Sequence, residues 1–324
     1  MTKKQRYYEY LYKRLVLVHR EWNGEGKLIH KEVELSQELK ELLDQISGRL
    51  GIRLHKNAVL NVEKFQLWRE EFGATVDSKY VEAATYFVLY CCLADKILDT
   101  ERFTQQEKER VYLDIKNFWN SSYNKSGEFL ELYKMRRKVL GFFAEMEKLY
   151  NNRYRILKDK IDCALASECF IYDHSLTDFD KDMNVHNVLD KSVEFVSASF
   201  LIGIGDLFEK EDIDVTDLIG EIFGYIDDIC DYVLDLETGS LNMALLICMN
   251  EKKNISLEER IGETVIHMDI MISLLEDKVI QLQKKVSTQM YLYLLDELWC
   301  WTGDIRRYVT EYPESNDISD SLGI

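Results

Sequence analysis

One stretch of the sequence decides the fold, Tyr225-Ile226-Asp227-Asp228-Ile229-Cys230-Asp231-Tyr232-Val233-Leu234-Asp235. Asp227, Asp231 and Asp235 recur every four residues, so a helix would place all three carboxylates along one face. The residues between them are mostly apolar, which is typical of a helix whose other faces are buried. Like charges at this spacing repel, and Mg²⁺ removes that cost because it binds one or two carboxylates together with phosphate oxygens. An acidic ladder facing solvent is the alternative interpretation.

A second pair of aspartates, Asp95 and Asp99, lies earlier in the chain. They stand at positions i and i+4 and therefore share one helical face. The nearly apolar stretch 83–94 leads directly into them, which would place the pair at the mouth of a hydrophobic core. A solvated helix end is the other interpretation of this pair.

The rest of the sequence favours helices. A single proline occurs in 324 residues, and proline is the residue that helix interiors exclude. Apolar residues recur at three- and four-residue steps over 271–282, the pattern of an amphipathic helix. Long stretches with few helix breakers predict further helices, over 81–99, 133–158, 217–236 and 288–308. We expect an all-α chain of roughly ten to twelve helices at typical lengths, forming a single domain over 1–324, with a frayed tail after about residue 313.

Charge and composition exclude several classes of function. The chain carries 41 Lys and Arg against 58 Asp and Glu, a net charge of −17, which argues against binding nucleic acid or anionic lipid. Its longest nearly apolar run has 12 residues, whereas a bilayer span needs about 20, so we expect no membrane span. The N-terminus lacks the apolar core of a secretory signal, and none of the seven cysteines forms a CxxC pair. These features predict a cytoplasmic protein with reduced thiols.

Other kinds of active site are not supported. The six histidines never fall at HxxxH spacing, and GxSxG, P-loop and GxGxxG motifs do not occur, which removes zincin, triad-hydrolase, P-loop and dinucleotide-binding chemistry. A chain of charge −17 can hold a multiply anionic diphosphate only if bound cations invert the local field. Two aspartate ladders on facing helices would supply the ligands.

These motifs resemble those of class I isoprenoid synthases, and most closely those of bacterial terpene synthases. Asp95 and Asp99 are similar to the first aspartate-rich motif of the family. Asp227, Asp231 and Asp235 occupy the ligand positions of the second motif of terpene synthases, (N/D)DxxSxxxE.

Asp228 raises a second possibility. With Asp227 and Asp231 it satisfies the DDxxD motif of trans-prenyltransferases. The spacing from Asp231 through Asp235 to Gly239 is also similar to that in squalene and phytoene synthases. The sequence therefore leaves the subfamily open.

Further segments bear on the choice between subfamilies. Arg307 and Tyr308 end an aromatic-rich segment, 80 positions after Asp227, and resemble the Arg-Tyr pair with which terpene synthases bind diphosphate. Lys191 precedes the second motif and is a further candidate to bind diphosphate. Lys96 replaces the second aspartate of a full DDxxD motif, and the GGKxxRP-type segment of chain-elongating prenyltransferases is missing. These departures argue against chain elongation.

The resemblance implies the class I terpenoid synthase fold and a cluster of three Mg²⁺ ions held by Asp95 and Asp99 on one side and by the second motif on the other. It also implies ionisation and cyclisation of a linear prenyl diphosphate, farnesyl or geranylgeranyl diphosphate, with release of diphosphate. The alternatives are a prenyltransferase or squalene/phytoene-synthase-like enzyme that joins isoprenoid units, and a non-catalytic helical subunit that binds a partner. The oligomeric state, a homodimer included, stays open.

Overall fold

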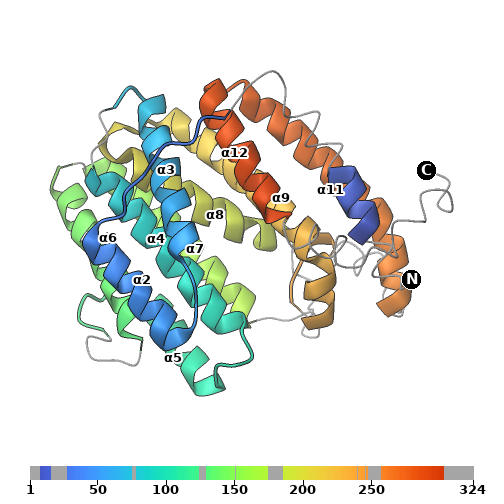
Figure 1. Ribbon diagram of the computed structural model, residues 1–324, viewed down its shortest axis with the longest axis horizontal. Helices are drawn as coiled ribbons and strands as arrows, with labels where there is room; N and C mark the ends of the chain where they lie inside the picture. Colours follow the sequence, from blue (N-terminus) through green and yellow to red (C-terminus); the bar gives the residue numbers. More distant parts are fainter. Residues whose placement is uncertain are drawn as a thin grey trace. The chain divides into compact units, whose positions relative to one another are not determined.

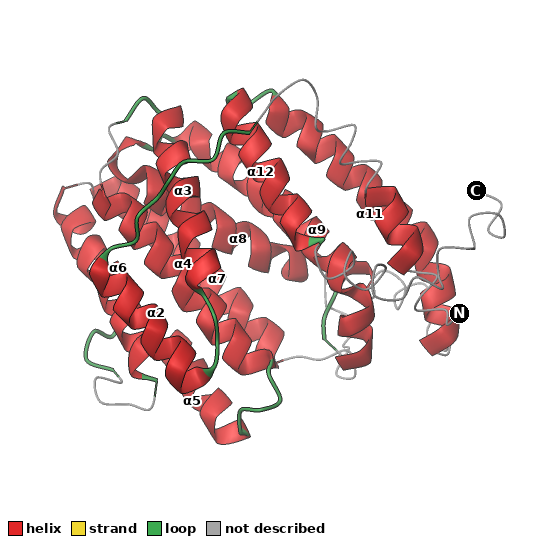
Figure 2. Cartoon of the chain, in the orientation of Figure 1, coloured by secondary structure: helices red, strands yellow, loops and turns green. Residues whose placement is uncertain are grey.

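The computed structural model describes residues 8–15, 28–74, 78–123, 129–149, 151–173, 185–238, 240–244, 246 and 257–302. These residues form helices, turns and loops, and none of them is in a strand (Figure 2). The prediction of an all-α chain is confirmed. Besides a short helical segment at 8–15, the helices are α2 (Gln37–Leu50), α3 (His55–Glu71), α4 (Ser78–Asp99), α5 (Gln105–Lys116), α6 (Leu130–Leu149), α7 (Asn151–Asp173), α8 (Val185–Ile204), the 3-10 helix η2 (Gly205–Leu207), α9 (Lys210–Thr238), α11 (Leu257–Gln283) and α12 (Thr288–Trp301) (Figure 1).

The chain divides into two compact units. The first unit comprises Met1–Leu28, His174–Ser192 and Glu221–Ile324, and the second comprises Ile29–Asp173 and Val193–Gly220. Helices α8 and α9 therefore contribute residues to both. The expectation of a single domain over 1–324 stays a prediction.

Helix α4 is the centre of the second unit. It packs against α3, α5 and α6, and α6 packs in turn against α2 and α7. The apolar stretch 83–94 supplies core residues, with Ala84, Phe87, Leu89 and Leu93 fully or almost fully buried. The structure therefore confirms the helix expected over 81–99. Its apolar stretch is buried because a helix that is apolar all round does not face water on any side.

Local signals set several helix ends. Thr104 and Glu107 form a capping box at the start of α5, in which each side chain accepts a hydrogen bond from the backbone N–H of the other residue. Ser36 caps α2 and Ser287 caps α12, each by accepting a backbone N–H three residues ahead. These caps satisfy N–H groups that have no partner inside a helix.

Most predicted helices agree with the structure, and one differs. The stretches 81–99, 217–236 and 271–282 lie inside α4, α9 and α11. The stretch 133–158 is divided between α6, which ends at Leu149, and α7, which begins at Asn151. Residue 150, between the two helices, lies outside the described residues. Helix α12 ends at Trp301, and residues 303–308 of the predicted helix lie outside the described residues, as does the tail after residue 313.

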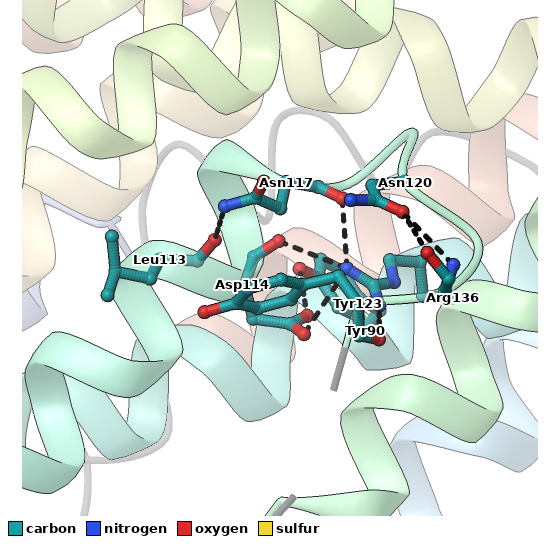
Figure 3. Close-up of polar contacts among 8 residues, drawn as sticks. Tyr90, Leu113, Asp114, Asn117, Asn120, Tyr123 and Arg136 are labelled. Carbon is teal, nitrogen blue, oxygen red and sulfur yellow. Dashed lines mark hydrogen bonds and ion pairs between the residues drawn. The ribbon is translucent and has the colours of Figure 1, made fainter. Parts of the chain in front are cut away.

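A buried arginine fastens α6 to the end of α5 and the turn that follows (Figure 3). Arg136 is completely buried, and its guanidinium lies 3.3 Å from the Asp114 carboxylate. It also donates hydrogen bonds to the backbone carbonyls of Asn117, at 3.0 Å, and Tyr123, at 2.6 Å. The Tyr90 hydroxyl donates to the other Asp114 oxygen at 2.9 Å. The charge pair is therefore embedded in hydrogen bonds that a buried pair needs to be stable.

No helix in the described part of the chain is long and apolar enough to cross a membrane.

Candidate functional site

The three ladder aspartates lie on α9, in the part of that helix that belongs to the first unit. Asp231 is exposed, whereas Asp227 and Asp235 are half-buried. The apolar neighbours Ile226 and Ile229 are almost fully buried. The structure therefore confirms a helix with one acidic face and an otherwise buried surface.

The spacing of the ladder limits how it can bind metal. Asp227 and Asp235 are eight residues apart, which is about 12 Å along a helix axis. Accordingly, within the described residues no three His, Cys, Asp or Glu side chains are close enough to hold one ion together. Neighbouring pairs of the ladder remain suited to Mg²⁺, since this ion takes only one or two carboxylates and completes its shell with water and phosphate oxygens. The donor set fits a hard divalent cation.

Asp228 differs from the ladder aspartates. Its side chain is buried, and its carboxylate accepts a hydrogen bond from the Met243 backbone N–H at 2.7 Å. Burial raises the pKa of the Asp228 carboxyl well above its ordinary value, and the Asp227 charge adds to this rise. The Met243 N–H and the Lys191 ammonium act in the opposite direction. Asp228 thus has an anchoring contact inside the protein.

Two glycines bring α8 and α9 into direct backbone contact. A Cβ atom at Gly220 would lie 2.6 Å from the Cα atom of Val193, and one at Gly224 would lie 3.0 Å from the Cβ atom of Ser192. Because glycine has no Cβ, only this residue permits such an approach. The contact explains how Lys191, the residue before Ser192 on α8, comes within electrostatic reach of Asp228 on α9.

A loop after α9 folds back onto the aspartates. Asn242 is completely buried, and its Nδ2 donates to the Asp228 backbone carbonyl and to Oδ2 of Asp235, both at 2.8 Å. Sequence analysis missed Asn242. The available signal was its place seven residues after Asp235 in a buried apolar stretch, where a polar side chain needs a partner.

The other aspartate pair lies at the end of α4, in the second unit. Asp95 is half-buried and Asp99 is exposed, and α4 ends at Asp99. The C-terminus of a helix is the negative end of its dipole, which disfavours carboxylates and favours cations. Asp235 lies in the last turn of α9 and meets the same condition. Asp99 and Asp235 therefore lie where a bound cation is favoured by the helix itself.

Lys64 on α3 is a second residue that sequence analysis missed. Its side chain is buried, and its Nζ lies 5.4 Å from the ring centroid of Phe65 and 5.6 Å from that of Phe200. Burial raises the pKa of the Cys92 thiol, one turn before Asp95, to about 11, and the Lys64 charge opposes this rise. Lys64 thus places a positive charge near the end of α4. A lone lysine in a helix normally faces solvent, so nothing in the sequence marks it.

The remaining predicted residues, Arg307 and Tyr308, lie outside the described residues. The structure brings together Lys191 and the second aspartate cluster in the first unit. Asp95 and Asp99 belong to the second unit. The prediction that both clusters bind the same ions therefore rests on the sequence resemblance.

No family model matches the sequence, and no curated protein matches it. Solved structures do. One is 2-methylisoborneol synthase from Streptomyces coelicolor A3(2), in complex with Mg²⁺ and 2-fluoroneryl diphosphate, at 10% identity over 87% of this chain and 96% of that chain, with a TM-score of 0.46. A second is α-eudesmol synthase, at 10% identity over 89% of this chain and 99% of that chain, with a TM-score of 0.48. A third is a variant of cucumene synthase, at 12% identity over 88% and 97%, with a TM-score of 0.44.

Identities of 10–12% say nothing about activity or substrate.

Proposed function

We propose that this chain is a Mg²⁺-dependent class I terpene synthase that ionises a linear prenyl diphosphate and cyclises it, releasing diphosphate. The observation that carries the proposal is the ladder of Asp227, Asp231 and Asp235 on α9, of which one member is exposed and two are half-buried. Like charges at four-residue steps on a helix repel one another, and cations bound among them relieve that repulsion.

The separate role of Asp228 supports a terpene synthase over a prenyltransferase. A DDxxD site would use Asp227, Asp228 and Asp231, but the Asp228 carboxylate is buried and accepts the Met243 N–H. The pattern that remains, with steps of four residues, is the one that resembles the terpene synthase motif. We therefore assign metal binding to Asp227, Asp231 and Asp235 and an anchoring role to Asp228.

The chain's own residues would act as follows. The ladder and the Asp95–Asp99 pair hold the ions, and Lys191, with Arg307 and Tyr308, binds the diphosphate. Bound Mg²⁺ supplies Lewis acidity that neutralises the leaving diphosphate. The carbon–oxygen bond would break with its electron pair on the diphosphate. Loss of a proton from the final carbocation to the diphosphate would give a hydrocarbon, and addition of water followed by the same proton loss would give an alcohol.

The deciding experiment is incubation of the purified protein with geranyl, farnesyl or geranylgeranyl diphosphate, with and without Mg²⁺ and isopentenyl diphosphate. Products are extracted and identified by mass spectrometry. We expect a cyclic hydrocarbon or alcohol from one substrate alone, with farnesyl or geranylgeranyl diphosphate preferred, and only in the presence of Mg²⁺. A longer diphosphate formed only with isopentenyl diphosphate would indicate a prenyltransferase. No product, together with no binding of Mg²⁺ and pyrophosphate, would indicate a non-catalytic subunit.

The substitution Asp227→Ala tests the ladder. We expect turnover to be abolished while the helical circular dichroism spectrum is unchanged, because the side chain is only half-buried and alanine is a good helix former. The control is Asp214→Asn, an exposed aspartate on the same helix, which should keep wild-type turnover. Unchanged turnover in Asp227→Ala would rule out the metal assignment. The cluster of three ions, a homodimer and a cytoplasmic location remain predictions.

A further inference from the structure

We propose that Asn242 is a positioning residue, which holds the Asp235 carboxylate in the orientation that binds metal. The inference rests on the proposed function, because it takes Asp235 to be a metal ligand. It adds a residue from outside the aspartate motifs and assigns a task to the loop that follows α9.

The side-chain contacts of Asn242 engage both of its N–H groups and its carbonyl oxygen. A side-chain amide has two N–H groups, and those of Asn242 go to the Asp228 carbonyl and to Oδ2 of Asp235, each at 2.8 Å. Its Oδ1 accepts the backbone N–H of Ala244 at 3.0 Å. The orientation of the amide is thereby fixed, because turning it over would set oxygen against two acceptors and nitrogen against a donor. With no exposed surface, Asn242 has no water to replace these partners.

The geometry explains what the contact does for Asp235. Asp228 and Asp235 are seven residues apart, which is about two turns of α9, and side chains on a helix lean toward its N-terminus, so the Asp235 carboxylate leans in the direction of Asp228. Asn242 joins these two groups and holds Asp235 in that position, on the side of the ladder where Asp231 precedes it. A carboxylate accepts several hydrogen bonds or metal bonds through its two oxygens. The Asn242 amide thus fixes one oxygen of the carboxylate, Oδ2, and with it the orientation of the whole group.

The loop itself is a rigid support. The Ser240 N–H donates to the Asp235 carbonyl at 2.9 Å, and the Leu246 N–H donates to the Asn242 carbonyl at 3.0 Å. Met243 donates its N–H to the Asp228 carboxylate at 2.7 Å. The apolar side chains that follow are buried, namely those of Leu241 in the loop and of Met243, Ala244 and Leu246 in the helical segment that begins after Asn242. Residues that support a metal ligand act best when they are themselves held in this way.

The test measures metal binding directly. Isothermal titration calorimetry with Mg²⁺, in the presence of inorganic pyrophosphate, compares the wild-type protein with Asn242→Leu, which keeps the volume and removes both donors. We expect the apparent Mg²⁺ affinity to fall about 10- to 100-fold, the usual effect of losing a partner of a metal ligand. Asn242→Ser, which is too short to join both acceptors, should show the same loss and serves if the leucine variant does not fold.

Two controls separate positioning from a structural effect. Asn61→Leu alters another buried asparagine, whose Nδ2 donates to the Asn57 carbonyl one turn earlier in its own helix, and should leave the Mg²⁺ affinity unchanged. In the Asp235→Ala background, Asn242→Leu should cause no further loss of affinity, because the carboxylate that it positions is gone.

The results have distinct meanings. Wild-type Mg²⁺ affinity in folded Asn242→Leu, or a further loss of affinity in the Asp235→Ala background, would overturn the inference and leave the proposed function standing. Absence of Mg²⁺ binding by the wild-type protein would overturn both.

Discussion

At the scale of single residues, buried polar side chains fix the loops of this protein. Arg136 spans Asp114 and two backbone carbonyls in the turn after α5, and Asn242 spans two groups of α9. In each case one side chain donates hydrogen bonds to several acceptors on a neighbouring segment. A buried acceptor left without a donor would cost about 1–3 kcal/mol. The loops are therefore held by hydrogen bonds as much as by apolar contacts.

Replacing Arg136 with methionine should destabilise the protein by about 3–5 kcal/mol, because the Asp114 carboxylate is left buried without its counter-charge. Urea unfolding followed by circular dichroism measures the change. Arg137→Met, at the exposed neighbouring position, should change stability by no more than about 0.5 kcal/mol. Combining Arg136→Met with Asp114→Leu should not restore stability, since the Asn117 and Tyr123 carbonyls stay without a donor. Full recovery in that double variant would show that the charge pair alone matters.

At the scale of elements, the contact between α8 and α9 depends on glycine. The Cβ atom of an alanine at Gly220 would lie 2.6 Å from a backbone atom of Val193, and backbone cannot move aside as a flexible side chain can. This close approach fixes how far α8 is displaced along α9, and it thereby fixes the position of Lys191 relative to Asp228.

We expect Gly220→Ala to cost about 1–3 kcal/mol, the range for overpacking a tight core. Gly141 is the matched control, because it is exposed on α6 and a Cβ atom there meets nothing within 4 Å. Gly141→Ala should stabilise the protein by about 0.5–1 kcal/mol, since alanine is the better helix former. Thermal unfolding of the two variants gives opposite shifts if this account is correct, and shifts of the same sign contradict it.

Sequence patterns predicted the positions of the helices better than they predicted which residues contact one another. Two local patterns were sufficient to place α4 and α9, namely the apolar run before Asp95 and the four-residue steps of Asp227, Asp231 and Asp235. Such patterns suffice because helical periodicity involves only residues that are close in sequence. Helix α3 was harder, since it buries Asn61, Glu63, Lys64 and Arg69 along with apolar side chains and shows no clean period. Asn242 and the inward position of Asp228 depend on partners distant in sequence or on another helix, which no local pattern records.

At the scale of the whole molecule, the net charge of −17 opposes the binding of any polyanion. A diphosphate meets a repulsive field that falls off within about 10 Å at ordinary ionic strength, and it must reach a site formed by carboxylates. Under the proposed function, metal ions are therefore a condition for binding as well as for the reaction.

Pyrophosphate alone should leave the melting temperature unchanged, whereas pyrophosphate with Mg²⁺ should raise it. A ligand at 100 times its Kd adds about 2.7 kcal/mol to the stability of the folded state, which corresponds to a shift of several degrees. Differential scanning fluorimetry measures the shift, EDTA should reverse it, and Asp227→Ala should not show it. An equal shift with pyrophosphate alone would mean that protein cations, without metal, bind the diphosphate.

The hydrogen bonds around Asn242 also bear on how this protein ages. Asparagine deamidates when the backbone nitrogen of the next residue attacks its side-chain carbonyl, a reaction that needs a free amide and a mobile backbone. Here the Met243 N–H is bound to Asp228, and both N–H groups of the Asn242 amide are engaged. Asn242 is consequently shielded from conversion to aspartate, which would place a fresh negative charge against Asp235. The contacts that orient this side chain also preserve its chemical identity over the lifetime of the molecule.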